Sequence, residues 1–299
     1  MPGRTVTELE RRYGRPGRDV LEALRGVVAT RGRIEPADVD RIAAELRLPR
    51  AHVNGAASFY ADLAPTSRGR RHVQVCAGTA CFAASAGAHV NKLAERLGAP
   101  VGGVSDDGDV SIQPVYCLGY CYGGPAALDD EQPRAGDDLI DQLTGEADPR
   151  DPEIPVAVEV PEPIVLAGVA RTGPEPWSVW EDIVRSGAHD RVSREVKASG
   201  LRGRGGAGFP AAVKWGSAAE APGDGDRYLI CNGDEGDPGS FVDRLLMERD
   251  PHRVLAGMAL AALAAGATRG IVYVRSEYPR ARGALREAVA EAQASGQLG

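Results

Sequence analysis

Apolar residues in the first part of the chain recur with the spacing of amphipathic helices, in a pattern that runs from Thr5 to Leu63. Two helical faces share this spacing, one formed by Leu21, Leu24, Val27 and Val28 and the other by Val39, Ile42, Ala43 and Leu46. Pro36 stands in the first turn of the second helix, where proline is tolerated, and Leu48–Pro49 ends that helix. Residues 50–60 predict a third short helix. We therefore predict a helical module over residues 1–67.

The pattern changes to strict alternation just before the first cysteine. His72–Cys76 alternates as a half-buried strand does, and Val110–Val115 predicts a second strand that leads into Cys117. Between them, Phe82–Leu97 predicts one helix, which Gly98 ends. We predict a compact α/β unit over residues 68–147, with its cysteines on loops at the strand ends.

Residues 148–163 are rich in proline, glutamate and aspartate, which predicts an extended, semi-rigid linker. Helical and strand-like patterns follow it over residues 164–299. Helices are predicted over residues 179–198, from about Pro210, and over 241–248, 251–265 and 280–294, with strands over 227–231 and 271–274. This part of the chain therefore predicts another α/β domain.

Length and composition restrict the class of protein. The chain has 299 residues, which is enough for two or three domains. A net charge of -7 and the lack of a basic stripe argue against binding to nucleic acid. The N-terminus has no apolar signal-peptide core, and the longest apolar run, Val254–Ala267, is too short to span a membrane. We expect a cytoplasmic protein, in which paired cysteines are more often metal ligands or redox centres than disulfides.

Four of the five cysteines form two close pairs, Cys76/Cys81 with C-x4-C spacing and Cys117/Cys121 with C-x3-C spacing. A two-iron cluster needs four thiolates on loops that wrap it closely, and neighbouring glycines such as Gly78 and Gly119 allow close approach. A zinc site stays open on spacing alone. A thioredoxin-type dithiol would require C-x-x-C, which is missing. Cys231 ends an apolar strand and is interpreted as a packed thiol.

Cys76-Ala-Gly-Thr-Ala-Cys81 and Cys117-Leu-Gly-Tyr-Cys121, in that order after the helical stretch RIEPADVDRIAAELRLPRAHVNGAASFYADL, resemble a known family. It is the thioredoxin-like [2Fe–2S] ferredoxin subunit of respiratory complex I, the 24 kDa or NuoE-type family. The resemblance covers about Leu21 to Pro125. It implies a thioredoxin-like fold over residues 68–147 and a [2Fe–2S] cluster held by all four paired cysteines.

A glycine-rich loop, Gly203 to Gly208, has the pattern G-x-G-x-x-G ahead of a predicted helix. The residues before it read as helix rather than strand, which disfavours a standard Rossmann NAD site, and no Walker Gly-Lys-Ser/Thr is present. Such a loop offers free N–H groups and a helix N-terminus to a phosphate, and Arg202, Arg204 and Lys214 add positive charge. A flexible surface loop is the alternative.

An acidic loop, Asn232 to Phe241, follows the strand at residues 227–231. Its carboxamide and carboxylates suit hydrogen bonds to ribityl or ribose hydroxyls. A calcium loop is disfavoured because the order of an EF-hand is not met. A solvated acidic turn stays open as the alternative.

The strings SGLRGRGGAGFPAAVKW and YLICNGDEGDPGSFVDRLLMERDPH, with IVYVRSEYPRARGALREAVAEA after them, resemble the FMN- and NADH-binding subunit of complex I, the 51 kDa or NuoF-type family. The resemblance covers about residues 164–299 and implies a partial Rossmann-like α/β flavin domain. It implies that the flavin phosphate is held by Gly203, Arg204, Gly205, Gly206 and Gly208.

The same resemblance assigns further contacts along both loops. It implies contacts to flavin or its phosphate from Lys214, Asn232, Asp234 and Glu235, and stacking of Phe209 on the nicotinamide nucleotide. Asp237 stands where the family usually has glutamate, which is expected to weaken a contact to NADH, and Ser276 stands where it usually has glycine.

The fused order resembles the diaphorase subunits of NAD-dependent formate dehydrogenases and NAD-reducing hydrogenases. It implies an α/β multidomain protein that passes electrons between NAD(H), FMN and Fe–S clusters as an NADH:acceptor oxidoreductase. Hydride and electron transfer require no acid–base pair, so no catalytic residue is assigned. The implied partners are other Fe–S or flavin subunits of a complex I-like, formate dehydrogenase or hydrogenase assembly, which would place the chain peripherally at the inner face of the membrane.

The family's second flavin-contacting segment, ubiquitin-like domain and triple-cysteine [4Fe–4S] motif do not occur in this sequence. We therefore expect a C-terminally truncated chain or one half of a split reading frame. This favours a second hypothesis, a non-catalytic [2Fe–2S] electron-transfer or assembly protein that does not retain FMN. A zinc-binding interaction module is the third. The sequence leaves the terminal electron partner, the direction of electron flow and the cluster potential open.

Overall fold

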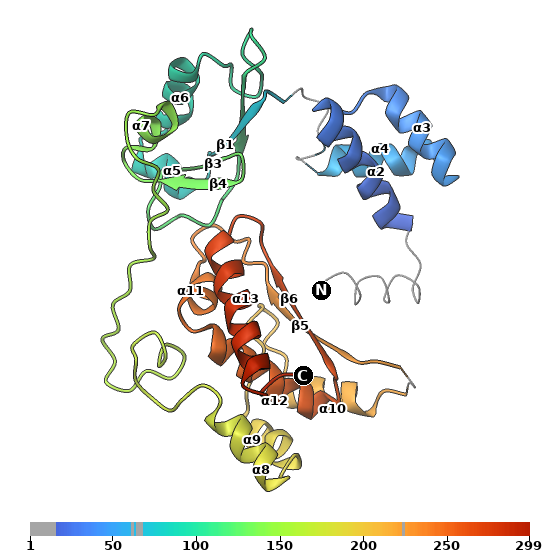
Figure 1. The fold of residues 1–299 in the computed structure, drawn as a ribbon, viewed down its shortest axis with the longest axis vertical. Helices are drawn as coiled ribbons and strands as arrows, with labels where there is room; N and C mark the ends of the chain where they lie inside the picture. The colour runs from blue at the N-terminus through green and yellow to red at the C-terminus, as the bar shows by residue number, and fades with distance from the viewer. Residues whose placement is uncertain (1–15, 61–62, 64–67, 223–224) are drawn as a thin grey trace. The chain divides into compact units, whose positions relative to one another are not determined.

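The computed structural model describes residues 16–60, 63, 68–222 and 225–299, which form two compact units (Figure 1). Unit 1 comprises residues up to 116 together with 125–150, and unit 2 comprises residues 117–124 together with 151–299. The part of the predicted helical pattern that precedes Pro16 lies outside the described residues. Unit 2 thus includes the short loop that carries the second cysteine pair.

Within the part of the N-terminal region that the structure describes, three helices are present, as the apolar spacing predicted. They are α2 (Pro16–Arg31), α3 (Pro36–Leu46) and α4 (Arg50–Phe59). Their common core contains Val20, Leu24, Ile34, Ile42 and Val53. Glu35 and Asp38 form a capping box at the start of α3, and the buried Asp38 carboxylate also accepts a 2.7 Å bond from Arg31.

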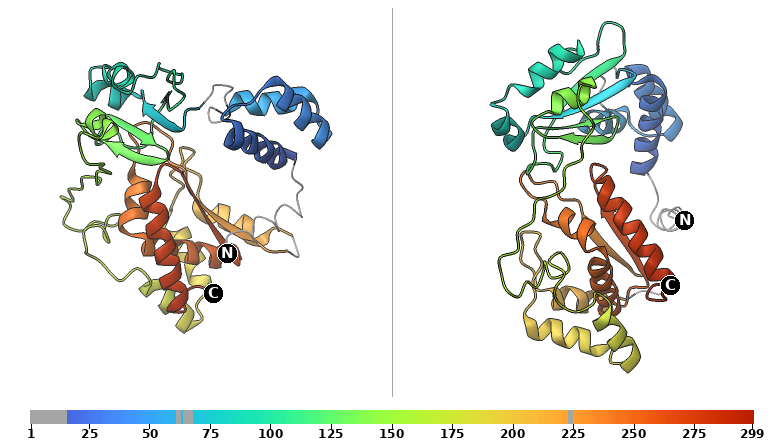
Figure 2. Two further views of the ribbon diagram at one scale, coloured as in Figure 1. Left: turned by 45° about the horizontal axis from the view of Figure 1, so that its top comes forward. Right: turned by 60° about the vertical axis from the view of Figure 1, so that its left-hand side comes forward.

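A four-stranded mixed sheet forms the rest of unit 1, in the order β2-β1-β3-β4 (Figure 2). Its strands are β1 (Arg71–Cys76), β2 (Val110–Val115), β3 (Ala126–Asp129) and β4 (Gln132–Ala135). β1 runs parallel to β2 and antiparallel to β3, which in turn pairs antiparallel with β4. Leu93 of α6 (His89–Leu97) and Leu139 of α7 (Leu139–Thr144) pack on Val73 and Ile112 of the sheet. The hairpin β3–β4 and helix α7 were not predicted.

The predicted single helix over 82–97 is wrong, because the chain forms α5 (Thr79–Ala84) and α6 with a break between them. Ala86 and Gly87 have φ values of 51° and 74°, a left-handed conformation that no α-helix continues through. A Cβ on Gly87 would collide with the Phe82 ring, so the turn requires glycine. Cys81 consequently lies inside α5 and not on a loop, which corrects the second part of that prediction.

The predicted linker carries no regular secondary structure over 148–159, and its first residues in unit 2 are held by side chains of that unit. Tyr122 donates a 3.0 Å hydrogen bond to the Pro152 carbonyl oxygen, and Arg280 donates one of 3.1 Å to that of Asp151. The Glu153 carboxylate forms ion pairs with Arg249 and Arg280. This end of the linker is therefore anchored along unit 2.

Eight regular elements follow the linker among the described residues of unit 2. They are α8 (Ser178–Ser186), α9 (Asp190–Ser199), α10 (Ala211–Glu220), β5 (Tyr228–Gly233), α11 (Val242–Arg249), α12 (Pro251–Ala265), β6 (Arg269–Val274) and α13 (Pro279–Ala294). The stretch predicted to be mostly helical over 179–198 forms α8 and α9, and α8 ends at Gly187, whose φ is 66°. β5 and β6 pair in parallel, and α11 and α12 form the connection between them.

The core of unit 2 lies among α12, α13 and the strands. It is formed mainly by Trp177, Met247, Leu255, Tyr278 and Leu285. Ile230 of β5 and Tyr273 of β6 are 62% and 56% exposed, so one face of this parallel pair is open in the described structure.

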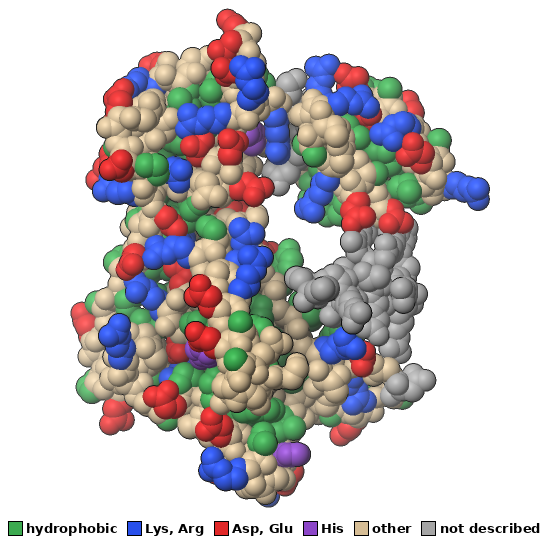
Figure 3. Space-filling model, viewed as in Figure 1, with side chains coloured by type: hydrophobic (Ala, Val, Ile, Leu, Met, Phe, Trp, Pro, Cys, Tyr) green, Lys and Arg blue, Asp and Glu red, His purple; other side chains and the backbone are tan. Residues whose placement is uncertain are grey.

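No helix among the described residues is long and apolar enough to cross a membrane. Acidic and basic side chains are mixed over the face shown in Figure 3.

Candidate functional site

The first cysteine pair lies where β1 passes into α5, and both side chains are 2% exposed. The carbonyl oxygen of Cys76 accepts a 2.7 Å hydrogen bond from Nε2 of His89, which is itself buried. Ser85 donates to the carbonyl oxygen of Cys81 at 2.9 Å, and its hydroxyl lies 2.6 Å from Nδ1 of His89. A Ser85–His89 link thus fixes the backbone of both cysteines.

The second pair lies in the loop of residues 117–124, hereafter the cysteine loop. The Sγ atoms of Cys117 and Cys121 are 3.5 Å apart. Two thiolates on one tetrahedral metal ion with bonds of about 2.3 Å lie about 3.8 Å apart, so the spacing fits a shared metal ion. Cys117 has a φ of 51°, which is an unusual value for a non-glycine residue. In this backbone conformation its side chain lies beside that of Cys121.

Among the residues that the structure describes, no three His, Cys, Asp or Glu side chains gather closely enough to hold a metal ion. Cys76/Cys81 belongs to unit 1, and Cys117/Cys121 belongs to unit 2. Within its own unit each pair is backed by polar side chains that bind its backbone carbonyls. These side chains were not identified from the sequence.

Arg244 of α11 supports the middle of the cysteine loop and is completely buried. Its Nη1 donates to the carbonyl oxygen of Gly119 at 3.4 Å, and its Nε donates to Glu248 at 2.6 Å. Its Cζ lies 4.2 Å from the centroid of the Tyr120 ring and 5.0 Å from that of Tyr278. Ring faces stabilise a desolvated guanidinium, so these aromatic residues compensate for burying the charge.

Arg275 follows β6 and supports the start of the cysteine loop. Its Nη2 donates to the carbonyl oxygen of Cys117 at 2.9 Å and to the Glu277 carboxylate at 2.8 Å, while Nη1 donates to the carbonyl oxygen of Glu235 at 2.7 Å. Burial raises the pKa of Tyr278 to about 12, so this phenol stays protonated and donates to the same Glu235 oxygen at 3.4 Å. The cysteine loop and the acidic loop thus share one guanidinium.

The acidic loop also contacts a cysteine sulfur directly. The backbone N–H of Gly239 donates a hydrogen bond to Sγ of Cys121 at 3.1 Å. N–H groups directed at cluster sulfurs raise the reduction potential of Fe–S clusters. The geometry therefore suits a thiolate ligand better than an inert thiol.

A pocket with a volume of about 460 Å³ lies at the glycine-rich loop, within the size range of small-molecule sites. Six residues singled out by the sequence line it, namely Arg202, Gly203, Gly205, Gly208, Phe209 and Lys214. Helix α10 begins at Ala211, which also lines the pocket and whose N–H is bonded to the Leu201 carbonyl oxygen at 2.9 Å. The N–H of Gly203 is already bonded to the Phe209 carbonyl oxygen at 2.8 Å. Arg204 and Gly206 do not line the pocket.

The acidic-loop residues have other positions. The Glu235 carboxylate is buried and accepts 3.1 Å hydrogen bonds from the backbone N–H groups of Asp243 and Arg244, so it caps the N-terminus of α11. Asn232 is the penultimate residue of β5, and its side-chain oxygen accepts a 3.0 Å bond from the N–H of Asp234. Asn232, Asp234, Glu235 and Asp237 are all absent from the lining of the pocket at the glycine-rich loop.

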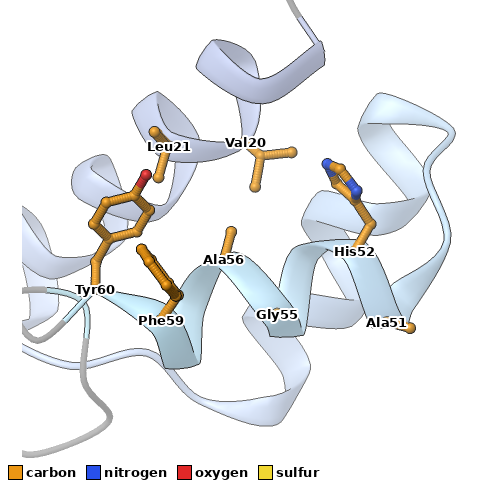
Figure 4. Close-up of a pocket in the computed structure, with 8 residues that line it drawn as sticks. All are labelled: Val20, Leu21, Ala51, His52, Gly55, Ala56, Phe59 and Tyr60. Atoms are coloured by element: carbon orange, nitrogen blue, oxygen red, sulfur yellow. The ribbon is translucent and has the colours of Figure 1, made fainter. Parts of the chain in front are cut away.

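Two other features lie outside these loops. The Cys231 thiol is half-buried in β5, and burial raises its pKa, which suits the packed thiol that its apolar surroundings predicted. A second pocket lies between α2 and α4, where Phe59 and Tyr60 face Leu21 (Figure 4). No residue that the sequence singled out for chemistry lines that pocket.

Models of two protein families match the chain. Residues 6–145 match the thioredoxin-like [2Fe–2S] ferredoxin family, and residues 196–298 match the Nuo51 FMN-binding domain. The two matches occur in the order that the cysteine pairs and the glycine-rich loop indicated. They confirm the family resemblance and the α/β multidomain fold class.

Individual relatives match the whole chain or part of it. The NAD-reducing hydrogenase HoxS subunit alpha of Cupriavidus necator is 30% identical over 317 residues, an alignment that covers 100% of this chain and 52% of that protein. The NADP-reducing hydrogenase subunit HndC of Solidesulfovibrio fructosivorans is 54% identical over 104 residues, 35% of this chain and 21% of that protein. The mitochondrial NADH-ubiquinone oxidoreductase 51 kDa subunit of Neurospora crassa is 44% identical over 126 residues, 41% of this chain and 25% of that protein.

A solved structure also matches along most of the chain. The crystal structure of an NAD+-reducing [NiFe]-hydrogenase in the air-oxidised state superimposes with a TM-score of 0.73 at 29% identity. The match covers 94% of this chain and 50% of that one. The chain thus spans about half of this relative's length.

Proposed function

Because the chain joins a thioredoxin-like [2Fe–2S] ferredoxin to part of a Nuo51-type FMN-binding domain, we propose that it passes electrons between NAD(H), FMN and Fe–S clusters. It would do so as a subunit of the NADH dehydrogenase or diaphorase type. The observation that carries this most strongly is the cysteine loop. Two sulfurs lie 3.5 Å apart there, and one of them accepts a backbone N–H.

The proposed cluster ligands are Cys76, Cys81, Cys117 and Cys121. Three of them are buried, and the carbonyl oxygens of Cys76, Cys81 and Cys117 are fixed by His89, Ser85 and Arg275, respectively. Buried ligands whose backbone is already bonded lose little freedom when they bind a metal, and such outer contacts orient the ligands. The cluster supplies single-electron storage when it is bound.

The proposed flavin site is the pocket at the glycine-rich loop. Gly203, Arg204, Gly205, Gly206, Gly208 and Lys214 would hold the phosphate, and Phe209 would stack on the nicotinamide nucleotide. Asn232, Asp234 and Glu235 would contact flavin, and Asp237 would contact NADH. FMN, when bound, supplies the conversion between hydride transfer and single-electron steps. The protein's part is to bind and orient both nucleotides.

The proposed partners are further Fe–S or flavin subunits. Both hydrogenase relatives are named as subunits, and the superimposed structure is a hydrogenase, which supports a complex I-like, formate dehydrogenase or hydrogenase assembly. We expect the chain to reside in the cytoplasm. Where its partner subunits bring it to the membrane, it would lie at the inner face.

Metal analysis and spectroscopy of the anaerobically purified chain test the cluster. Iron at about two per chain, with an EPR signal that appears on reduction, is the expected result. Stoichiometric zinc in a colourless protein would overturn the assignment and favour the zinc-binding alternative.

A second function, electron transfer without NADH oxidation, is favoured by one observation. Four predicted nucleotide contacts, Asn232, Asp234, Glu235 and Asp237, do not line the pocket that the glycine-rich loop forms. Fluorescence of FMN released by heat, together with NADH–ferricyanide activity, separates the two functions. Bound FMN with activity supports the oxidoreductase, while an iron-containing chain that lacks both supports the electron carrier.

A further inference from the structure

The Arg275 side chain hydrogen-bonds both to a proposed cluster ligand and to the acidic loop. The Arg275 side chain is 8% exposed. Its guanidinium has two terminal nitrogens that point apart like a fork, and each of them binds a different carbonyl oxygen. One nitrogen binds the Cys117 carbonyl oxygen at 2.9 Å, and the other binds that of Glu235 at 2.7 Å. A lysine at this position has a single ammonium and cannot reproduce such a fork.

The charge of Arg275 is balanced by Glu277 through a 2.8 Å contact. Both side chains are sheltered from solvent, 8% and 22% exposed, so their charges are weakly screened. An Fe–S cluster gains one negative charge when it takes up an electron, and net charge and hydrogen bonds around it set its reduction potential. A guanidinium bonded to a ligand's own carbonyl oxygen therefore stabilises the reduced state, and the neighbouring carboxylate opposes that effect.

We propose that Arg275 is a positioning residue that orients Cys117 and, in balance with Glu277, sets the reduction potential of the proposed [2Fe–2S] cluster. The proposal rests on the proposed function, because it requires Cys117 to be a cluster ligand. Its consequence is that a segment matching the FMN-binding family controls the redox poise of the ferredoxin-type cluster. The acidic loop is bonded to the same guanidinium and therefore helps to hold Arg275 in position.

The test is an anaerobic redox titration of the full chain, with dithionite as reductant, followed by EPR and visible spectra. Arg275→Gln leaves Glu277 without its cation and is expected to disfavour reduction about tenfold, a fall of about 59 mV for a one-electron couple. Glu277→Gln leaves Arg275 uncompensated and is expected to shift the potential upward by a similar amount. Arg275→Lys keeps the charge and is expected to restore most of the potential.

Arg253→Gln is the matched control, because its guanidinium binds Asp250 and the Pro174 carbonyl oxygen in the same unit. Its potential is expected to equal that of the wild type. Opposite shifts from Arg275→Gln and Glu277→Gln support the proposal, since a merely structural role does not predict opposite signs. Equal potentials, or shifts of the same sign, in chains that contain iron overturn it.

Failure of the inference is distinguishable from failure of the proposed function. A wild-type chain without an Fe–S spectrum refutes the function and this inference with it. A wild-type chain with a cluster, whose potential is indifferent to Glu277→Gln, refutes the inference alone. If Arg275→Gln yields no folded protein, the upward shift in Glu277→Gln decides the question.

Discussion

At the scale of residues, the cysteine loop owes its shape to a few contacts that sequence spacing does not reveal. The cysteine pairs and the glycine-rich loop are local motifs, so the sequence predicted them directly. Arg244 and Arg275 are distant in the chain from the Gly119 and Cys117 carbonyl oxygens that they bind. His89 is separated from Cys76 by a helix break that was not predicted. Only the folded chain brings these three side chains to the carbonyl oxygens of Cys76, Gly119 and Cys117.

Gly119 gives a test of this packing. Its φ is 79°, and a Cβ there would overlap the Tyr278 ring, which is fully buried. Gly119→Ala is expected to lower the free energy of unfolding by about 1–3 kcal/mol beyond the cost of its positive φ. Gly187→Ala is the control, because Gly187 has a φ of 66° and open space around its Cβ position. Urea denaturation measures both, and equal losses would contradict the packing described here.

At the scale of elements, most helices and strands follow the periodicity, and the errors have identifiable causes. The helix predicted over 82–97 breaks at Ala86 and Gly87, where the backbone has positive φ. The spacing of apolar residues does not predict this turn, because packing stabilises it. The short hairpin β3–β4 and helix α7 contain too few residues to show a period. Helix α11 depends on a cap from a residue outside it, Glu235.

Removing that cap should destabilise α11. Glu235→Ala takes away the acceptor of two backbone N–H bonds and is expected to cost about 1–2 kcal/mol of unfolding free energy. Asp237→Ala is the control, because Asp237 is an exposed carboxylate of the same loop. The two variants are compared by urea denaturation monitored by circular dichroism. A loss in Asp237→Ala as large as that in Glu235→Ala would show that capping is not the cause.

The turn after β6 should make stability depend on pH. Burial acts to raise the pKa of Glu277, but the hydrogen bond and charge of Arg275 outweigh it and hold that pKa below its usual 4.5. The carboxylate therefore contributes stability that is complete above pH 4.5 and is lost as the pH falls through the folded-state pKa. Glu277→Gln is expected to be about 1 kcal/mol less stable than wild type at pH 7.

That difference should shrink as the solution is acidified below pH 4.5, because the wild-type carboxylate then becomes protonated as well. Denaturation curves for both proteins between neutral and acidic pH measure it. A difference that stays constant over this range would show that ionisation of Glu277 contributes nothing to stability.

At the scale of the whole molecule, the cysteine loop groups with unit 2 and not with the residues that flank it in the sequence. The sequence assigns residues 68–147 to one domain, yet residues 117–124 form a compact unit with residues 151–299. Contacts from Arg244, Arg275 and Tyr278 explain this grouping, since all three lie in unit 2. The proposed [2Fe–2S] ligand pair Cys117/Cys121 therefore groups with the segment related to the FMN-binding family.

The central claim is that the paired cysteines hold a two-iron cluster, and iron content in single-cysteine variants tests it most directly. Wild type and Cys231→Ser, which changes the remaining thiol, in β5, are expected to contain about two irons per chain and to give the same EPR signal on reduction. Cys117→Ser is expected to lose the signal and most of its iron. Iron content unaffected by Cys117→Ser would contradict the account.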